Sequence, residues 1–220
     1  MSKRVAAPLD LRADREHARV LTPVSDDALA RLDKFVALLL DWQRKINLVA
    51  DSTLPNLWTR HVSDSLQLLQ LAQGAKTWID LGSGGGFPGL PVACALAGTP
   101  DAKAHLVESN GKKVAFLREA VRITGVPAVV HNERIENFGD SFTGRADVVT
   151  ARALAPLTLL CKQAFPFIAK GAIGLFLKGQ DVEAELTEAA KYWKVEAELM
   201  PSLTSAEGSI LAVRTLRPAK

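Results

Sequence analysis

A short apolar run followed by a cluster of glycines, at residues 77–91, limits the possible folds of this chain more than any other feature. Trp78, Ile79 and Leu81 give the run the length and composition of a buried strand. Glycines then occupy most of the turn before a helical apolar pattern begins: Gly82, Gly84, Gly85, Gly86 and Gly89. A strand, a glycine-rich turn and a helix direct backbone N–H groups at an anionic or adenosyl ligand, and glycine lets that ligand lie against bare backbone. The stretch therefore predicts a cofactor of this kind.

Two cofactor classes use such a turn. The spacing Gly84-x-Gly86-x-x-Gly89 satisfies the dinucleotide fingerprint GxGxxG. Asp80, two places before Gly82, gives the pattern a second form, which resembles the first motif of methyltransferases that use S-adenosylmethionine (SAM). In that motif the acid faces the methionine moiety. A carboxylate at this place attracts an ammonium group and repels a pyrophosphate, so the pattern favours SAM over NAD.

The composition is that of an ordinary globular chain of 220 residues, 48% hydrophobic and 23% charged. This length suits one main domain with an appendage. No run reaches the roughly 18 apolar residues of a membrane span, and the N-terminus lacks the apolar core of a signal peptide. We therefore expect a cytoplasmic, monomeric protein without a membrane segment.

Cysteine and histidine usage argues against a metal site or a disulfide. Cys94 and Cys161 both lie in apolar helical stretches and are interpreted as buried small side chains. The four histidines do not have zinc-ligand spacing, so we expect no metal. A net charge of +3 permits a nucleic-acid substrate without establishing one.

The first third of the chain is predicted to be helical. Residues 1–24 show no sustained period and are predicted to be a loosely held arm. Residues 25–74 are predicted to form a helical cap, with one long helix from Ser25 to about Lys45 and shorter ones through Trp58 and over residues 63–71. The remaining residues, 75–220, are assigned to the cofactor-binding domain.

From residue 77 onward the pattern alternates between strand and helix. Strands are predicted at 77–81, 104–108, 128–131, 146–151 and 172–178, and helices at 88–97, 111–124, 156–169 and 181–192. Two further strands, at 194–200 and 209–216, have no helix between them and predict a terminal hairpin. The fold class is therefore α/β, a mostly parallel, Rossmann-like sheet with ligand at the carboxyl ends of its strands. With the hairpin it has the seven strands usual for class I SAM methyltransferases.

A second acidic residue is expected where the second strand ends. Glu108 stands there, placed to accept hydrogen bonds from a ribose diol. Because NAD and SAM both contain a ribose, Glu108 supports an adenosyl cofactor without choosing between them. Arg134, Ile135 and Glu136 follow the third strand, where an adenine edge usually lies in such folds.

The absence of two motifs narrows the possible methyl acceptors. The Asn/Asp-Pro-Pro-Tyr/Phe motif of exocyclic amine methylation does not follow the fourth strand, where residues 150–156 read TARALAP. Methylation of pyrimidine C5 needs a cysteine nucleophile, and both cysteines lie away from the strand ends. A nucleophile with an exposed lone pair, such as guanine N7, fits what is left. Such a nucleophile needs positioning and no general base.

Several ordered segments together carry a family resemblance. They are Asp41-Trp42-x-x-x-x-Asn47-Leu48, Arg60-His61-x-x-Asp64-Ser65, Gly82-Ser-Gly84-Gly85-Gly86-Phe87-Pro88-Gly89, Glu108-Ser109-x-x-Lys112-Lys113, Arg134-Ile135-Glu136, Arg152-Ala153 and Leu177-Lys178-Gly179. Over these segments the chain resembles the RsmG (GidB) family of bacterial 16S ribosomal RNA guanine-N7 methyltransferases. The resemblance runs from about residue 30 to the last strand.

The resemblance implies a role for each matching position. The SAM-binding set is Asp80, Gly82, Gly84, Gly86, Phe87, Glu108, Ile135, Glu136 and Arg152. The RNA-binding set is Arg60, Arg134, Arg152 and Lys178, in a cleft expected to be basic, with Arg152 and Lys178 positioning the reacting groups. The implied substrate is 16S rRNA, free or in a small ribosomal subunit or assembly intermediate, with guanine 527 as the methylated base. Gly208-Ser209 departs from the family, many of whose members carry a basic pair there, so the resemblance does not imply a phosphate contact at this position.

Simpler structural interpretations stand beside these roles. Arg60, His61 and Asp64 could form a charge cluster within one helix. Arg152 could serve as a structural partner of Asp80 or Glu136. The four tryptophans are interpreted as core residues rather than as base-stacking platforms: Trp42, Trp58, Trp78 and Trp193.

Two other functions are kept as alternatives. The first is an NAD(P)-linked oxidoreductase, although the chain lacks a Tyr-x-x-x-Lys acid and its sole tyrosine is Tyr192. The second is an RNA-binding scaffold with a vestigial SAM pocket. Asp80 and Glu108 argue against the scaffold because both cofactor acids are present.

Overall fold

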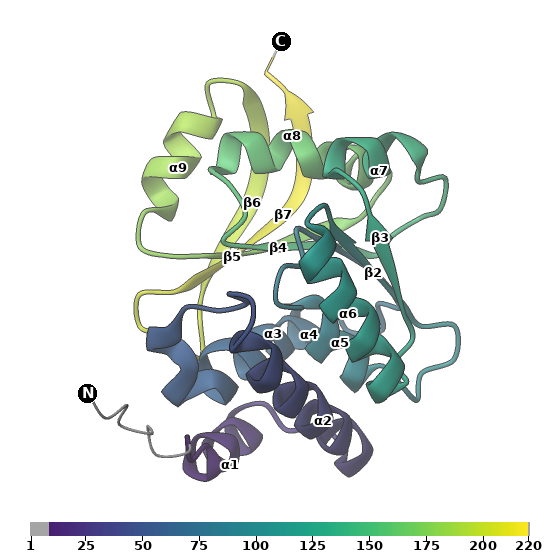
Figure 1. The fold of residues 1–220 in the computed structure, drawn as a ribbon. Coiled ribbons are helices and arrows are strands. Elements are labelled where there is room, and N and C mark those ends of the chain that lie inside the picture. Colours follow the sequence, from purple (N-terminus) through teal and green to yellow (C-terminus); the bar gives the residue numbers. More distant parts are fainter. Residues whose placement is uncertain (1–8, 220) are drawn as a thin grey trace, which may run out of the picture.

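A seven-stranded sheet forms the centre of the structure, a computed structural model that describes residues 9–219 (Figure 1). Its strands are β1 (Thr77–Leu81), β2 (Lys103–Glu108), β3 (Ala128–Asn132), β4 (Val148–Arg152), β5 (Ile173–Lys178), β6 (Trp193–Pro201) and β7 (Ser209–Pro218). They lie in the order β3-β2-β1-β4-β5-β7-β6. The first five strands pair in parallel, and β7 runs antiparallel to both β5 and β6. The predicted parallel sheet and its terminal hairpin are confirmed.

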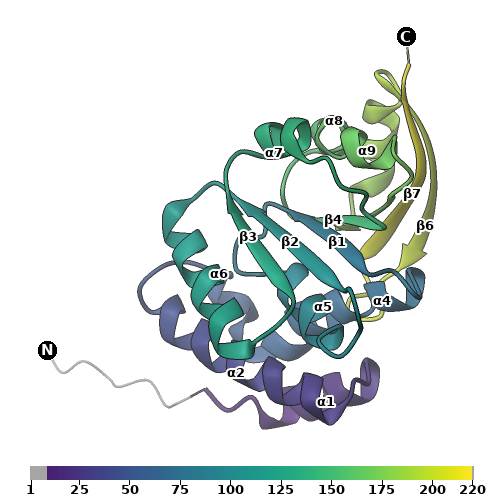
Figure 2. The same cartoon turned by 90° about the vertical axis from the view of Figure 1, so that its right-hand side faces the viewer.

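Helices cover both faces of this sheet (Figure 2). One face carries α5 (Gly89–Ala95) and α6 (Gly111–Thr124), and the other carries α7 (Ile135–Ser141), α8 (Leu157–Ile168) and α9 (Val182–Ala189). Strand β1 shows why both faces are apolar. Trp78 packs beside Val92 of α5, whereas Ile79 and Leu81 pack in the cluster beneath α8, as the two-residue period of a strand requires. The sequence did not predict α7, a seven-residue helix with a glycine inside it that is too short to show a helical period.

The predicted N-terminal cap consists of one long helix and a series of short turns. Helix α2 (Asp26–Gln43) begins at Ser25, whose Oγ accepts a hydrogen bond from the Ala28 N–H at 3.2 Å. After it come η1 (Asp51–Asn56), a 3₁₀ turn, η2 (Trp58–Ser63), a π-helical turn, α3 (Asp64–Leu66) and α4 (Leu68–Leu71). Because α2 packs against α5 and α6, the cap continues the core of the sheet domain.

Part of the predicted N-terminal arm is an ordered helix, so that prediction is wrong for residues 12–21. Helix α1 (Arg12–Leu21) packs on η2 and buries Ala18. The Asp14 carboxylate accepts hydrogen bonds from the backbone N–H groups of Trp58, at 2.7 Å, and Thr59, at 3.2 Å, and from the Thr59 hydroxyl at 2.6 Å. These donors stand at the start of η2, where backbone N–H groups lack helical partners. Residues 1–8 of the predicted arm lie outside the described residues.

The core interpretations of tryptophan and cysteine are confirmed. Trp58 and Trp78 are buried, and Trp42 and Trp193 pack against apolar clusters. The cysteines are buried and unpaired, and burial raises the pKa of Cys94 to about 12 and that of Cys161 to about 11. Within residues 9–219, helices long and apolar enough to cross a membrane are absent.

We expect Asp14→Ala to lower the free energy of unfolding by about 1–2 kcal/mol, because it leaves donors at the start of η2 without a partner. Urea unfolding monitored by tryptophan fluorescence measures the change. Asp41→Ala, which removes an exposed carboxylate of α2 that has no hydrogen bond or ion pair among the described residues, is the control and should leave the midpoint in place. Equal midpoints for the two variants would show that α1 is not held through Asp14.

Candidate active site

The loop after β1 is shaped by glycines that no other residue could replace without strain. Gly82 has φ +69° and Gly86 has φ +91°, values that side chains other than glycine rarely adopt. A Cβ at Gly82 would lie 2.4 Å from Cδ1 of Leu154, and one at Gly85 would lie 2.8 Å from the Leu48 carbonyl oxygen. The loop is therefore enclosed between the cap and the segment that follows β4.

Asp80 holds the end of this loop by a hydrogen bond. Its side chain is buried, with Oδ2 accepting from the Gly89 N–H at 3.1 Å and Oδ1 from the Thr150 hydroxyl at 3.2 Å. Burial raises the pKa of Asp80 to about 6, although these hydrogen bonds oppose the shift. Asp80 lines neither of the two cavities described below. In this structure it joins β1 to the start of α5, and its predicted contact with a methionine moiety stays a prediction.

Glu108 lies at the end of β2, as the sequence predicts, and its carboxylate faces the glycine loop. Oε2 accepts from the Gly84 N–H at 3.0 Å, and Oε1 accepts from the Asn110 N–H at 2.7 Å. Each carboxylate oxygen can accept more than one hydrogen bond. The carboxylate is therefore held in a fixed orientation and retains acceptor capacity for a diol.

A cavity of about 290 Å³ opens beside this carboxylate. Of the predicted cofactor-binding set, six residues line it: Gly82, Gly84, Glu108, Ile135, Glu136 and Arg152. Asp80, Gly86 and Phe87 do not; Phe87 is buried between the rings of Phe35 and His61. Sequence reasoning missed Gln163 of α8, whose Nε2 donates to Glu136 Oε1 at 2.9 Å and lowers the pKa of that carboxyl.

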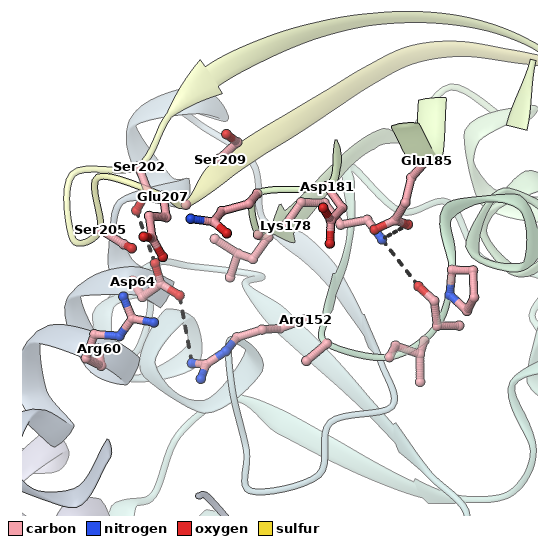
Figure 3. Close-up of a pocket in the computed structure, with 18 residues that line it drawn as sticks. Arg60, Asp64, Arg152, Lys178, Asp181, Glu185, Ser202, Ser205, Glu207 and Ser209 are labelled. Carbon is pink, nitrogen blue, oxygen red and sulfur yellow. Dashed lines mark hydrogen bonds and ion pairs between the residues drawn. The ribbon is translucent and has the colours of Figure 1, made fainter. Parts of the chain in front are cut away.

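A second cavity, of about 820 Å³, lies at the carboxyl ends of β4 and β5 (Figure 3). The cap contributes Arg60 and Asp64, and the tip of the β6–β7 hairpin contributes four more of its lining residues, Ser202, Ser205, Glu207 and Gly208. Both cavities are lined by residues 152–154. Residues 152–154 therefore form a wall shared by the two cavities, and ligands in the two cavities would lie on opposite sides of it.

The predicted RNA-binding residues divide between the two cavities. Arg60, Arg152 and Lys178 line the larger one, whereas Arg134 lines the smaller one. The cleft is also less basic than predicted, because the larger cavity contains four carboxylates beside its three cations: Asp64, Asp181, Glu185 and Glu207. The expectation of a basic cleft is wrong for this cavity. Two of its acids, Glu185 and Glu207, come from α9 and the hairpin tip, which the cofactor motifs do not include.

Lys178 is held by an internal ion pair. Its Nζ lies 2.6 Å from Oε2 of Glu185 and donates to the Ala155 carbonyl at 3.3 Å (Figure 3). The same Glu185 oxygen accepts from the Leu157 N–H at 2.7 Å, at the start of α8. The ammonium is therefore largely compensated, and Lys178 orders the wall of the cavity. Glu185 lies in no recognised motif, so no sequence pattern indicates this pair.

Arg152 connects the sheet to the cap. Its Nη2 lies 2.5 Å from Nδ1 of His61, its Nη1 lies 3.9 Å from Oδ2 of Asp64, and its guanidinium stands over the Phe87 ring at 5.7 Å. The alternative that Arg152 pairs with Asp80 or Glu136 is wrong, because its carboxylate partner is Asp64. The alternative of a charge cluster confined to one helix is also wrong for His61 and Asp64, which both face Arg152.

Asp64 also fixes the hairpin tip. Its Oδ1 accepts from the Thr204 hydroxyl at 2.6 Å and from Gln67 Nε2 at 2.9 Å, while Gln67 Oε1 accepts from the Leu203 N–H at 2.9 Å. The tip contains residues 202–208, and the sequence showed only that it connects two strands. Its contact with the cap completes the larger cavity.

Comparison with known proteins assigns the chain to a family. The GidB family, described as rRNA small subunit methyltransferase G, matches residues 28–212. The chain belongs to this family. Proteins named ribosomal RNA small subunit methyltransferase G from Bradyrhizobium sp. strain BTAi1 and Rhodopseudomonas palustris strain BisB18 are 59% and 55% identical, over 95% and 99% of this chain and 94% and 93% of theirs.

Solved structures at low sequence identity place the fold of this GidB family member among class I SAM methyltransferases. Cofactor-bound Rv0187 from MTB superposes with a TM-score of 0.61 at 16% identity, covering 94% of this chain and 99% of that one. An O-methyltransferase from Bacillus cereus in complex with SAH gives 0.60 at 12% identity, over 91% and 96%. Groups of three or more potential metal-ligating side chains were not found in residues 9–219.

We expect Gly82→Ala to abolish calorimetrically detectable SAM binding and to destabilise the fold by more than about 1 kcal/mol, because the new methyl group meets Leu154 at a strained φ. Gly98→Ala is the control, since a Cβ there meets nothing within 4 Å. Wild-type SAM affinity in Gly82→Ala would show that the loop adapts and does not shape the site.

The buried His61 predicts an acid-labile fold. Burial, followed by the charges of Arg152 and Arg60, lowers its pKa from 6.5 to about 3. Between those values the unfolded chain binds a proton on His61 that the folded chain does not bind. The free energy of unfolding should therefore fall as the pH falls from 6.5 toward 3.

We expect His61→Phe to show a shallower pH dependence of the free energy of unfolding over this window than the wild type. Urea unfolding at a series of pH values measures it. His17→Gln, on the exposed side of α1, controls for the loss of a histidine and should keep the wild-type slope. An unchanged slope in His61→Phe would contradict the assignment.

Proposed function

We propose that this member of the GidB family transfers the methyl group of SAM to N7 of one guanine in 16S rRNA, guanine 527 as the family resemblance implies. The enzyme acts on ribosomal RNA as a cytoplasmic monomer, and the substrate is 16S rRNA, free or within a small ribosomal subunit or an assembly intermediate.

One observation supports this proposal above the others: the two cavities share residues 152–154. Methyl transfer needs the donor carbon and the acceptor atom in line and about 3 Å apart. A small cavity beside Glu108 and a larger one across Arg152 provide two compartments that meet at one wall. The larger volume suits a nucleotide drawn out of an RNA strand.

The residues of the smaller cavity fit the cofactor by their chemistry. Glu108 retains acceptor capacity for a ribose diol, and Gly82 and Gly84 present bare backbone to the ligand. Ile135 and Glu136 offer an apolar side chain and a carboxylate to an adenine. When bound, SAM supplies an electrophilic methyl group on a sulfonium.

Guanine N7 suits the groups that line the larger cavity, which we call the acceptor cavity; the smaller one is the cofactor cavity. Its lone pair is free at neutral pH, so no residue has to remove a proton. His61 is buried, hydrogen-bonded on both nitrogens and neutral, so it does not act as a proton shuttle. Of the candidate bases, Glu185 is held by Lys178 and Asp64 by the hairpin tip. Asp181 and Glu207 also line this cavity, but a reaction at N7 requires none of these carboxylates to remove a proton, so positioning is sufficient.

The oxidoreductase and scaffold hypotheses are both less well supported than the methyltransferase. Membership of the GidB family replaces the oxidoreductase hypothesis. The scaffold hypothesis predicts a degraded cofactor pocket, yet Glu108 and the glycine loop form a bonded, enclosed one. The substitution Gly208-Ser209 stands at the rim of the acceptor cavity, where it removes a candidate phosphate contact without touching the cofactor pocket.

The test is transfer of labelled methyl from SAM to small ribosomal subunits, and to their RNA, from cells that lack this protein. Aniline cleavage then detects N7-methylguanine. We expect a single new cleavage in 16S rRNA, and at least a hundredfold lower rate in Arg152→Ala, because the shared wall loses its positioning group. Arg122→Ala, on the exposed side of α6, is the matched control and should keep wild-type activity.

Two results would contradict the proposal. Label in RNA without aniline cleavage would retain the methyltransferase and exclude N7. Failure to label either RNA or subunits, with calorimetric SAM binding intact, would favour the scaffold.

A further inference from the structure

Arg152 has a buried nitrogen that the protein leaves without a hydrogen bond. Nη2 donates to His61, but Nη1 lies 3.9 Å from Asp64 Oδ2, which is beyond hydrogen-bond distance. Nη1 is buried and, among the described residues, has no hydrogen-bond partner. A buried guanidinium N–H without an acceptor is costly. At a wall shared by two ligand cavities, an acceptor supplied by a ligand removes that cost.

The position of Arg152 depends on the direction of a short hydrogen-bond chain. The Thr53 hydroxyl donates to the Ala50 carbonyl at 2.7 Å, so its oxygen accepts from Nε2–H of His61 at 2.7 Å. With its one proton on Nε2, the neutral imidazole presents Nδ1 as a bare acceptor to Arg152. The ring is also held against Phe87, with ring centroids 4.9 Å apart. His61 therefore fixes both the place and the rotation of the guanidinium.

The position of Arg152 at the wall between the two cavities indicates which RNA atom accepts a hydrogen bond from Nη1. Phosphates would stay near the mouth of the acceptor cavity, whereas the reacting base must come to the wall shared with the cofactor cavity. On that edge guanine presents two acceptors, O6 and N7. N7 has to keep its lone pair for the methyl group, so O6 is the acceptor left for Nη1. Adenine places an amino donor at the O6 position and would leave Nη1 unpaired.

We propose that Arg152, positioned by the imidazole of His61, donates from Nη1 to O6 of the target guanine and so selects guanine over adenine. This proposal rests on the proposed function. His61 is a positioning residue, because it acts on the substrate only through Arg152. Asp64 places a carboxylate beside the Arg152 guanidinium, and the same side chain accepts a hydrogen bond from the hairpin tip.

Substrates with a single altered base test the contact with O6. Full-length 16S rRNA is assembled by splinted ligation with guanine, inosine or 2-aminopurine at the methylated position and reconstituted into subunits. Inosine keeps N7 and O6, whereas 2-aminopurine keeps N7 and the amino group but lacks O6. We expect kcat/KM of the wild-type enzyme to be at least about tenfold lower on 2-aminopurine than on inosine.

Matched variants test the role of His61. His61→Phe retains an aromatic ring against Phe87 but has no acceptor for Arg152, and His61→Asn places an amide oxygen near the position of Nδ1. We expect His61→Phe to lower kcat on guanine and to reduce the preference for inosine over 2-aminopurine to less than about threefold. His61→Asn should restore the preference. A cooperative urea transition and a wild-type far-UV circular dichroism spectrum confirm that both variants are folded.

A spectroscopic measurement tests the same arrangement without turnover. In ¹⁵N-labelled wild-type protein, we expect the His61 ring to show a protonated Nε2 and an unprotonated Nδ1. The opposite tautomer would overturn the positioning role. Equal methylation of inosine and 2-aminopurine by an enzyme that methylates guanine would overturn the contact with O6 and leave the proposed function standing. Failure to methylate the guanine RNA would overturn the proposed function itself.

Discussion

The buried guanidinium of Arg152 is the interaction on which the arrangement of this protein depends. Burial lowers its pKa below the ordinary value, and the Asp64 carboxylate opposes that shift. A charge at such a depth is tolerated only with partners, and removing one partner is far more costly than forming the pair is favourable. Those partners, His61 and Asp64, come from the cap, while Arg152 ends β4. Cap and sheet therefore cannot separate without leaving the cation unpaired.

The same cation lies where the reaction moves charge. In the proposed reaction, methyl transfer to a neutral guanine carries one positive charge from the cofactor cavity to the acceptor cavity, across the wall that contains Arg152. The acceptor cavity has Asp181 and Glu207 free of internal ion pairs among the described residues, in addition to the paired Asp64 and Glu185. Carboxylates around the acceptor favour the cationic product base. A cavity that is less basic than an RNA surface is thus consistent with a base-binding role, with phosphate contacts left to residues nearer its mouth.

Sequence reasoning succeeded where structure follows from local pattern. The strand period, the glycine loop and Glu108 at the end of β2 all depend on neighbours in the chain, and each was placed correctly. It failed for α1, a polar helix with one buried alanine, and for the partner of Arg152, which stands far away in sequence. Lys178 shows the same limit. Its motif indicated a ligand contact, but only the fold could show that its ammonium already forms an ion pair with Glu185.

The hairpin tip offers a physical reason for the departure at Gly208-Ser209. A Cβ at Gly208 would lie 3.1 Å from the Cβ atoms of both Ser202 and Ser205, so a side chain there would require these serines to shift by a few tenths of an ångström. The closed tip is what allows Thr204 and Leu203 to reach the cap. Replacing a basic pair by small residues therefore exchanges a candidate phosphate contact for a tighter connection to Asp64. Because Asp64 faces Arg152, the exchange acts on the position of the guanidinium that separates the two cavities.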